Sequence, residues 1–344
     1  MVGSERVHVR IGPTEYECID PWGELSDPEV SRAWPHSAVA WTSSGHVWTF
    51  HPARSSLLRL DADGAVVSEH PVPIAEAHGI FAAREGAKEY LWLADASVKR
   101  RPESGYQPTS DDSGSVVVKC DLAGNVVQSL PRPVHSAYHN GPYRPTWVGV
   151  CDPNHGGSGD VWVADGYGQS LVHRYDAAGR LLGSLSGEEG AGRFKGPHIA
   201  FLDTRREEPE MYIADRGNAR IQVYGMDGRF RRVVGAGMLS SPTSFAIDGP
   251  RLLVMEYYPP RMLVLDATDS LVGIVGENLK PLAQPSFPFV RDSEGKPTPP
   301  AGMGSGRFGI PHSVTVDGSG NLYFTDVAFG SHFSKWRRVA VDPQ

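Results

Sequence analysis

The sequence has few cysteines and no long apolar run. Its three cysteines, Cys18, Cys120 and Cys151, are an odd number and have no Cys-x-x-Cys spacing. This argues against a disulfide framework and a thiolate zinc site, so we expect small core residues instead. No apolar run approaches the roughly 20 residues that cross a bilayer. We therefore expect neither a membrane span nor a membrane partner.

The sequence also lacks an excess of basic residues and an apolar leader. The 33 Lys and Arg residues are fewer than the 40 Asp and Glu residues, which gives a formal net charge of −7. Proteins that bind nucleic acid usually have a basic surface, so no nucleic-acid partner is expected. Residues 1–14 contain Glu5, Arg6, His8 and Arg10 in place of an apolar segment. No secretory signal is visible, and a cytoplasmic location is expected.

Glycine and proline, in contrast, are abundant. The chain contains 39 glycines and 28 prolines, and they recur along its whole length between short apolar segments. Frequent turns between short apolar strands are typical of an all-β protein.

One pattern recurs six times along the chain. Each copy has an apolar strand, a second apolar-aromatic strand that mostly ends in an acidic residue, a third strand closing with Asp-x-x-Gly, and a fourth apolar strand. The second strands align at 47–51, 91–95, 161–165, 211–215, 252–256 and 322–326. Six four-stranded units predict a single six-bladed β-propeller domain over residues 1–344. Its blades are expected at about 37–70, 78–130, 144–185, 196–235, 242–276 and 311–342.

The two ends of the chain and two long segments depart from this repeat. The sixth unit has no fourth strand of its own, so we expect Arg6–Ile11 to supply it and to close the ring by pairing near Lys335–Val341. Residues 99–115 and 278–308 exceed the length of the repeat. Long loops inside compact domains are usually functional or disordered, so both insertions are candidates for lids or for surface decoration.

Histidine occupies one position of the innermost strand in alternate units. His78, His198 and His312 hold it in the second, fourth and sixth units, whereas Thr146 and Thr243 hold it in the third and fifth. The spacings, 198 − 78 = 120 and 312 − 198 = 114, are about two blades each. The three side chains should therefore converge on the axis of the ring. Three neutral imidazoles with open coordination positions predict a divalent metal site, with zinc as the preferred ion.

The other ten histidines do not share this position. A single histidine is usually a hydrogen-bonded structural residue. We therefore expect His51, His139, His155 and His332 to be structural or exposed.

These repeats resemble the NHL-repeat propellers over nearly the whole chain. Within them, the histidines and two further segments resemble the catalytic domain of peptidylglycine α-amidating lyase, also called peptidyl-α-hydroxyglycine α-amidating lyase. That family binds zinc through three channel histidines, and the resemblance assigns this role to His78, His198 and His312.

The two further segments follow second strands. Residues 164–167 read Ala-Asp-Gly-Tyr, which matches the family's Asp-Gly-Tyr, and residues 214–222 match its Ala-Asp-Arg-x-Asn-x-Arg-Ile-Gln. The resemblance implies that Tyr167 is the catalytic base and that Arg216 binds or positions a carboxylate. The aspartates that end these strands, and Arg220, are expected to hold strands and turns together.

The chain also departs from the family's pattern. The family has a catalytic arginine directly after Phe-His in the first blade, where this chain has Pro52, so Arg54 is the candidate replacement. An aspartate that helps the family to bind a structural calcium is Ser313 here, so the sequence does not support that calcium. The family's half-cystines are missing at Gly168 and Tyr212, which fits a cytoplasmic relative.

The resemblance implies a metal-dependent lyase that acts on a small molecule, and we expect the chain to be a monomer. The reaction would be non-redox C–N cleavage of an α-hydroxyglycine-like carbinolamide or of a similar small hydroxylated substrate. Two alternatives stay open: a metal-dependent hydrolase or hydratase that uses a metal-bound hydroxide, and a non-catalytic NHL propeller that binds a protein partner. Lactonases of the gluconolactonase type fit less well, because they use acidic and asparagine ligands.

Overall fold

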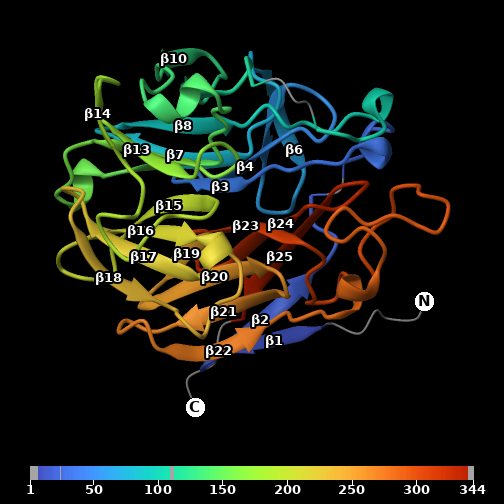
Figure 1. The fold of residues 1–344 in the computed structure, drawn as a ribbon. Helices are drawn as coiled ribbons and strands as arrows, with labels where there is room; N and C mark the ends of the chain where they lie inside the picture. The colour runs from blue at the N-terminus through green and yellow to red at the C-terminus, as the bar shows by residue number, and fades with distance from the viewer. Residues whose placement is uncertain (1–6, 24, 109–111, 340–344) are drawn as a thin grey trace.

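The computed structural model describes residues 7–23, 25–108 and 112–339 of the chain. Six antiparallel sheets follow one another along the sequence. Figure 1 shows them around a common axis, with the colour running round the ring so that the first and last strands lie side by side. The prediction of an all-β, six-bladed propeller is confirmed.

Five of the six sheets consist of four consecutive strands each. In chain order these strands are β3 (Val39–Thr42), β4 (His46–Phe50), β5 (Ser56–Leu60) and β6 (Val66–Pro71); β7 (Gly79–Glu85), β8 (Lys88–Asp95), β9 (Val116–Asp121) and β10 (Val126–Ser129); β11 (Trp147–Val150), β12 (Val161–Asp165), β13 (Leu171–Tyr175) and β14 (Leu181–Leu185); β15 (Pro197–Asp203), β16 (Glu210–Asp215), β17 (Arg220–Gly225) and β18 (Phe230–Val234); β19 (Pro242–Asp248), β20 (Arg251–Tyr257), β21 (Pro260–Leu265) and β22 (Leu271–Val275).

The sixth sheet joins the two ends of the chain. Its strand order is β1-β2-β25-β24-β23, and its strands are β23 (Pro311–Val316), β24 (Leu322–Asp326), β25 (His332–Arg338), β2 (Thr14–Ile19) and β1 (His8–Ile11). The N-terminus therefore does complete the last blade, as expected.

The prediction of which strand makes this contact was wrong, however. β2 pairs with β25, from Tyr16 opposite Arg338 to Ile19 opposite Lys335, whereas β1 pairs only with β2 as an outer, fifth strand. A turn at Gly12, which has a φ of +57°, splits the N-terminal segment into a hairpin. Arg6 and Val341 lie outside the described residues.

Helical structure among the described residues is limited to six short 3-10 helices. They are η1 (Val30–Arg32), η2 (Pro102–Ser104), η3 (Ser136–His139), η4 (Pro153–His155), η5 (Arg216–Asn218) and η6 (Lys280–Ala283). None of them has the length or the apolar character of a membrane-crossing helix.

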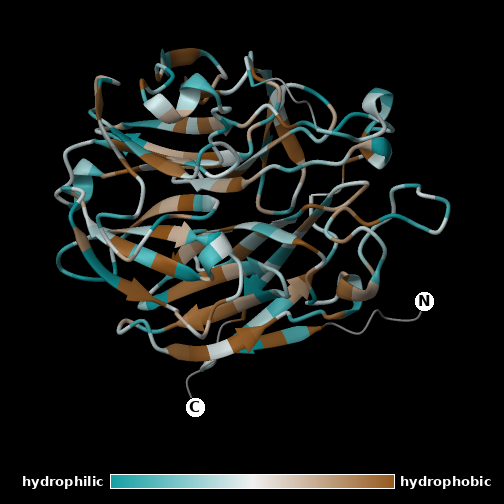
Figure 2. Cartoon of the chain, viewed as in Figure 1, coloured by the Kyte–Doolittle hydropathy of each residue, from teal (hydrophilic) through white to brown (hydrophobic). Residues whose placement is uncertain are grey.

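Aromatic and β-branched residues make the second strand of each blade the centre of its packing. Trp48, Trp92 and Trp162 occupy the same place in β4, β8 and β12, and all three are fully buried. Figure 2 shows the hydrophobic colour concentrated on the strands and the hydrophilic colour on many of the loops. Side chains of alternating direction pack against both neighbouring blades, which is why the second strands are buried on both faces, whereas outermost strands such as β6, β10 and β22 are largely exposed.

The Asp-x-x-Gly signature forms the hairpin between the third and fourth strands. Between β9 and β10, the Asp121 carboxylate accepts hydrogen bonds from the backbone N–H groups of Ala123 and Asn125. Gly124 has a φ of +83°, a conformation that glycine adopts without steric cost. These turns fix the register between the third and fourth strands of a blade.

Candidate metal centre

The three predicted histidines lie at the start of the innermost strands of alternate blades. His198 and His312 are the second residues of β15 and β23, and His78 directly precedes β7. All three side chains are buried. The intervening blades carry hydroxyl residues at this position, so the described channel has an alternating ring of imidazole and hydroxyl residues.

Each of these imidazoles is held by the next blade through its Nδ1 atom. The acceptors are the backbone carbonyl oxygens of Thr146, Thr243 and Ser37, at 2.7, 2.7 and 3.1 Å from His78, His198 and His312 respectively. Because a carbonyl oxygen only accepts, Nδ1 carries the hydrogen and Nε2 keeps its lone pair. This hydrogen bond fixes the tautomer and the ring direction that a metal ligand needs.

Two of these lone pairs face each other. The Nε2 atoms of His78 and His312 are 3.2 Å apart, although neither nitrogen has a hydrogen to donate. Two nitrogens bound to one tetrahedral zinc lie about 3.3 Å apart, so a cation between them would turn this repulsive contact into a favourable one. The Nε2 atom of His198 is buried and has no hydrogen-bond partner among the residues that the structure describes. Its ring lies 5.0 and 5.2 Å from the rings of His78 and His312.

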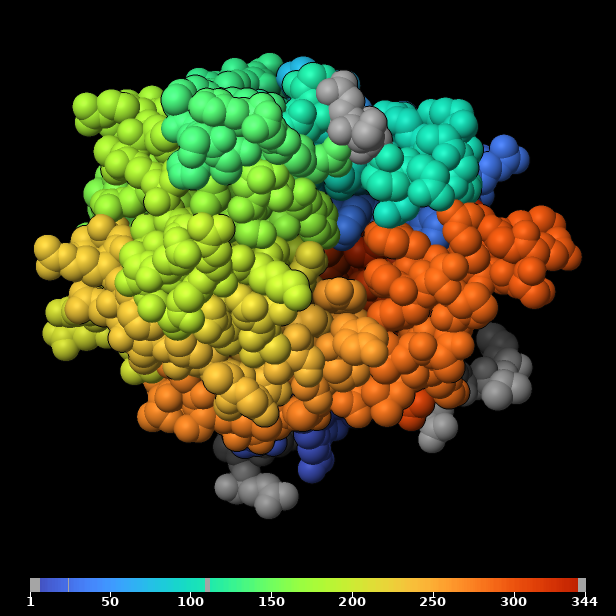
Figure 3. Space-filling view, viewed as in Figure 1, coloured from blue at the N-terminus to red at the C-terminus, as the bar shows by residue number. Residues whose placement is uncertain are grey.

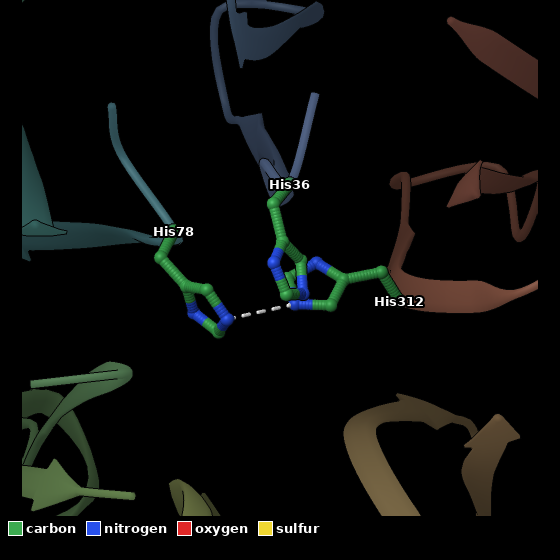
Figure 4. Close-up of side chains that lie close together, drawn as sticks. All are labelled: His36, His78 and His312. Carbon is green, nitrogen blue, oxygen red and sulfur yellow. Dashed lines mark hydrogen bonds between the residues drawn. The ribbon is translucent and has the colours of Figure 1, made fainter. Parts of the chain in front are cut away.

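A fourth histidine, His36, joins this group, and the sequence analysis missed it. The donor atoms of His36, His78 and His312 all lie within 4.8 Å of one another, and Figure 4 shows the three rings converging from separate parts of the chain. His36 precedes Ser37, the residue equivalent to the other channel histidines, and therefore stands one residue out of register. The dipeptide Pro35-His36, which repeats the Pro-His of two other blades, is the signal that could have found it.

Burial keeps these imidazoles neutral. Burial, followed by the neighbouring imidazoles and Arg100, lowers the pKa of His36 well below the usual value for histidine. Burial also lowers the pKa of His78 and His198 well below that value, and neighbouring imidazoles and Arg216 add to the effect. Burial also lowers the pKa of His312, to about 4, against the opposing effect of its hydrogen bond to Ser37. Neutral imidazoles are the form that binds a metal ion. The donor set therefore fits a divalent metal such as zinc.

Tyr167 follows β12 and turns into the channel. Its hydroxyl oxygen lies 3.2 Å from Nε2 of His78 and 3.3 Å from Nε2 of His36. Glycine is needed just before it, because a Cβ atom at Gly166 would lie 2.3 Å from the carbonyl oxygen of Pro197. The phenol therefore reaches the same point as the imidazoles.

Arg216 follows β16 and adds a positive charge beside this phenol. Its guanidinium lies 5.3 Å from the ring of Tyr167 and 5.5 Å from that of Tyr257. No carboxylate among the described residues lies within ion-pair distance of it, because Asp215 pairs with Arg220 at 2.7 Å instead. Arg216 is therefore available to an anionic ligand, whereas Asp215 and Arg220 hold the turn, as the sequence analysis expected.

A cavity of about 600 Å³ opens directly above the histidines. Figure 3 shows a hollow on this face, with dark red and blue atoms at its floor between the teal and orange segments. Three arginines line the cavity, and the described lining contains no acidic side chain; the lining residues that matter below are His36, Arg100, Tyr167, Arg216, Tyr257 and Phe289.

Both insertions lie at the rim of this cavity. The guanidinium of Arg100, from the first insertion, stacks 3.5 Å from the ring centre of Phe289, from the second. Arg291 donates a hydrogen bond to the carbonyl oxygen of Gly105 at 3.1 Å. The ring of Trp34 packs against Phe289 at 5.4 Å. The two insertions therefore contact each other and narrow the entrance.

Arg54 lies away from this cavity. It forms ion pairs with Asp27, Glu29 and Glu69 and is not among the residues that line the cavity. The structure therefore does not bring Arg54 together with Tyr167 and Arg216.

The remaining residues singled out in the sequence have local partners or are exposed. His51 accepts hydrogen bonds from two backbone N–H groups, and His139 and His155 are exposed. His332 lies 2.8 Å from Asp20 and 3.2 Å from Asp326. The Ser313 hydroxyl accepts a hydrogen bond from the N–H of Val39 in the first blade, at 3.2 Å.

Fold and site together define a six-bladed β-propeller with a histidine centre at one end of its channel. Its sequence relatives are NHL-repeat proteins. NHL repeat-containing protein 3 of Homo sapiens is 29% identical over 233 residues, and that of Mus musculus is 26% identical over 232 residues. Each match covers 64% of this chain and 60% of the relative's own length. The chain matches no protein-family model.

Solved structures with the same fold are more distant in sequence. A streptogramin B lyase superimposes with a TM-score of 0.56 at 12% identity, over 94% of this chain and 98% of the other. A catalytically inactive virginiamycin B lyase from Staphylococcus aureus with quinupristin gives a TM-score of 0.53 at 11% identity, over 98% and 97%. At these identities the likeness shows the propeller fold alone.

Proposed function

We propose that the protein is a metal-dependent lyase that resembles peptidylglycine α-amidating lyase and holds zinc through His78, His198 and His312. The observation that carries the proposal is that neutral imidazoles lie next to one cavity, which His312, Tyr167 and Arg216 line, and that the Tyr167 hydroxyl lies 3.2 Å from Nε2 of His78. No carboxylate of the described residues pairs with Arg216 there. The solved lyases share only the fold with this chain, and this fold hosts many functions. Their likeness is therefore an analogy and gives no evidence about the site.

The substrate that fits this set is an N-acyl-α-hydroxyglycine or a similar small hydroxylated acid. Its carboxylate would pair with Arg216, because a guanidinium can donate two parallel hydrogen bonds to a carboxylate. The described lining contains no acidic side chain that would repel the substrate. The aromatic rings of Tyr257 and Phe289 would pack against its apolar part.

In the proposed reaction Tyr167 moves one proton. As a phenolate, Tyr167 would take the proton from the substrate hydroxyl, while the O–H electron pair forms the carbonyl of glyoxylate and the C–N pair passes to nitrogen. Tyr167 would then return the same proton to that nitrogen, which regenerates the phenolate. Amide and glyoxylate result without any change in oxidation state. The bound metal would supply Lewis-acid polarisation of a substrate oxygen. Such proton transfer by a positioned group is typically worth roughly 10²- to 10⁴-fold in rate.

The rival proposal is a non-catalytic propeller that binds a protein partner. It is favoured by one observation, that the matched relatives are named only for their repeats. A hydrolase or hydratase at the same histidines would instead require water among the reactants.

The test combines metal analysis with product detection. Purified full-length protein should contain close to one zinc per chain and should release glyoxylate from N-acyl-α-hydroxyglycines, without any uptake of ¹⁸O from labelled water into the amide. Protein without stoichiometric metal and without product from a panel of carbinolamides would contradict the lyase and favour the partner-binding propeller. A carboxylic acid that carries ¹⁸O from labelled water, formed in place of the amide, would indicate a hydrolase that cleaves the acyl–nitrogen bond.

A further inference from the structure

His36 is the one imidazole at this centre to which the proposed function gives no role. It lies in the segment between η1 and β3, and its ring centre is 4.6 Å from that of His78 and 4.5 Å from that of His312. These distances are as short as the 4.5 Å between His78 and His312 themselves. His36 is therefore as much a member of the cluster as the two strand residues.

The backbone around His36 is held in place by buried groups. Its N–H donates a hydrogen bond to Oε1 of Glu76 at 3.3 Å, and the same carboxylate lies 3.4 Å from the ammonium of Lys99. The side chains of Glu76 and Lys99 are only 2% and 5% exposed. The preceding Trp34 is buried as well. Such anchoring fixes the direction in which the imidazole points, as a ligand requires.

His36 also approaches the centre from the side of the cavity, which it lines together with His312. His198 is not among the residues that line the cavity, and no group of the described residues forms a hydrogen bond with its buried Nε2 atom. The ligand atoms of His36, His78 and His312 lie within 4.8 Å of one another, and the ring of His198 lies 5.0 and 5.2 Å from those of His78 and His312. We propose that His36 is a fourth ligand, so that four imidazoles, His36, His78, His198 and His312, hold the metal. This inference rests on the proposed metal site.

A set of four imidazoles has different properties from a set of three. The charge does not differ, because neutral imidazoles leave the ion its full double positive charge in both cases; the difference lies in the number of positions that the protein fills. Four nitrogens complete a tetrahedral shell, and the protein itself then fills the position that faces the cavity. A substrate from the cavity has to displace His36 or add as a fifth ligand. His36 is the only one of the four outside the equivalent ring position, which suits it to this exchange.

The competing explanation is that His36 only positions Tyr167, whose hydroxyl lies 3.3 Å from its Nε2 atom. The two roles differ in what the metal itself experiences. A ligand contributes to the coordination number of the ion, whereas a partner of Tyr167 does not.

The experiment titrates Co²⁺ alone into metal-free full-length protein and records the visible absorption and the dissociation constant. The parent should give the intense bands of a four-nitrogen site, and X-ray absorption of the zinc form should count four imidazoles. His36→Phe, which keeps a ring but no nitrogen, should lower the affinity at least 10-fold, weaken the bands and reduce the count to three. Tyr167→Phe should retain the parent spectrum and count. Thermal melting of each metal-free variant confirms that the propeller is folded.

Two results overturn the inference. A His36→Phe protein with the parent's spectrum, affinity and ligand count would show that His36 is not a ligand, while metal bound by three imidazoles would leave the proposed lyase intact. Tyr167→Phe reproducing the changes of His36→Phe would show that His36 acts through the phenol. Conversely, a four-imidazole site without any lyase product would support this inference and contradict the proposed function.

Discussion

The two ends of the central channel are lined by the same six strands but differ completely in chemistry. Where the strands begin, imidazole and hydroxyl residues alternate beneath a cavity of about 600 Å³. Further along the same strands lies a hollow of about 180 Å³, lined by apolar residues such as Ile80, Trp147, Phe201, Phe245 and Val316. The difference shows that the propeller provides a scaffold and that a single strand position provides the site.

The largest effect should separate the two ends directly. His78→Ala removes a ligand and should lower metal affinity at least 10²-fold while the protein stays folded. Ile80→Ala, two residues along the same strand, creates a cavity and should cost about 2–5 kcal/mol of stability while metal content stays close to the parent's. Metal analysis and thermal melting of both variants check this. Full metal occupancy in His78→Ala would abolish the distinction between the ends.

The next effect concerns proton transfer by Tyr167, which lines the cavity. Tyr167→Phe keeps the ring and removes the hydroxyl, so turnover of an identified substrate should fall on the order of 10²-fold or more. Tyr257→Phe is the matched control, because Tyr257 lines the same cavity and contacts Arg216. Steady-state kinetics should show little change in the control. Equal turnover in both variants would mean that Tyr167 serves only as a packed aromatic residue.

A smaller effect should follow from the loss of the unpaired guanidinium. Arg216→Ala should raise KM for an anionic substrate roughly 10-fold or more, since a hydrogen bond to a charged group contributes about 1.5–3 kcal/mol. Arg54→Ala serves as the control, because Arg54 is ion-paired outside the cavity. A rise in KM for Arg54→Ala of the same size would show that the substrate reaches beyond the described lining.

The smallest effect concerns His332 in β25, which belongs to the sheet that joins the two ends of the chain. Burial opposes the charged form of His332, but its hydrogen bonds to Asp20 and Asp326 outweigh this and raise its pKa to about 10. In the unfolded chain the pKa of histidine is about 6.5. The stabilisation is therefore complete below about pH 6.5 and is lost as the pH rises through about 10.

His332→Gln should accordingly lower the melting temperature most near neutral or mildly acidic pH, and by much less near pH 10. Thermal melting of parent and variant across this range checks the sign. A difference that grows with pH would show that His332 is neutral in the folded protein.

The repeats could be predicted from the sequence because they depend on local patterns. Alternating apolar residues and acidic strand ends locate β4, β8, β12, β16, β20 and β24 within a few residues. The three channel histidines follow from the same register. His36 could not be found in this way, since it stands one residue outside that register and reaches the centre only through the packing of its segment.

Local patterns also fail to predict which strand closes the ring and how the two insertions contact each other. Two adjacent segments near the N-terminus both form strands, and only the tertiary pairing of Cys18 with Trp336 decides which one meets the last blade. The contact between Arg100 and Phe289 joins two loops without any periodic pattern. Contacts between segments far apart in the sequence depend on the folded ring, so no local pattern predicts them.

Pairing between the first and last strands also constrains the order of folding during synthesis. β2 ends at Ile19, and its partner residue is Lys335, 335 − 19 = 316 residues later. A ribosome adding about 5–20 residues per second needs roughly 15 s to 1 min for that length. During this time five blades can form on the emerging chain, while the first-made hairpin waits with an unpaired edge until translation is almost complete.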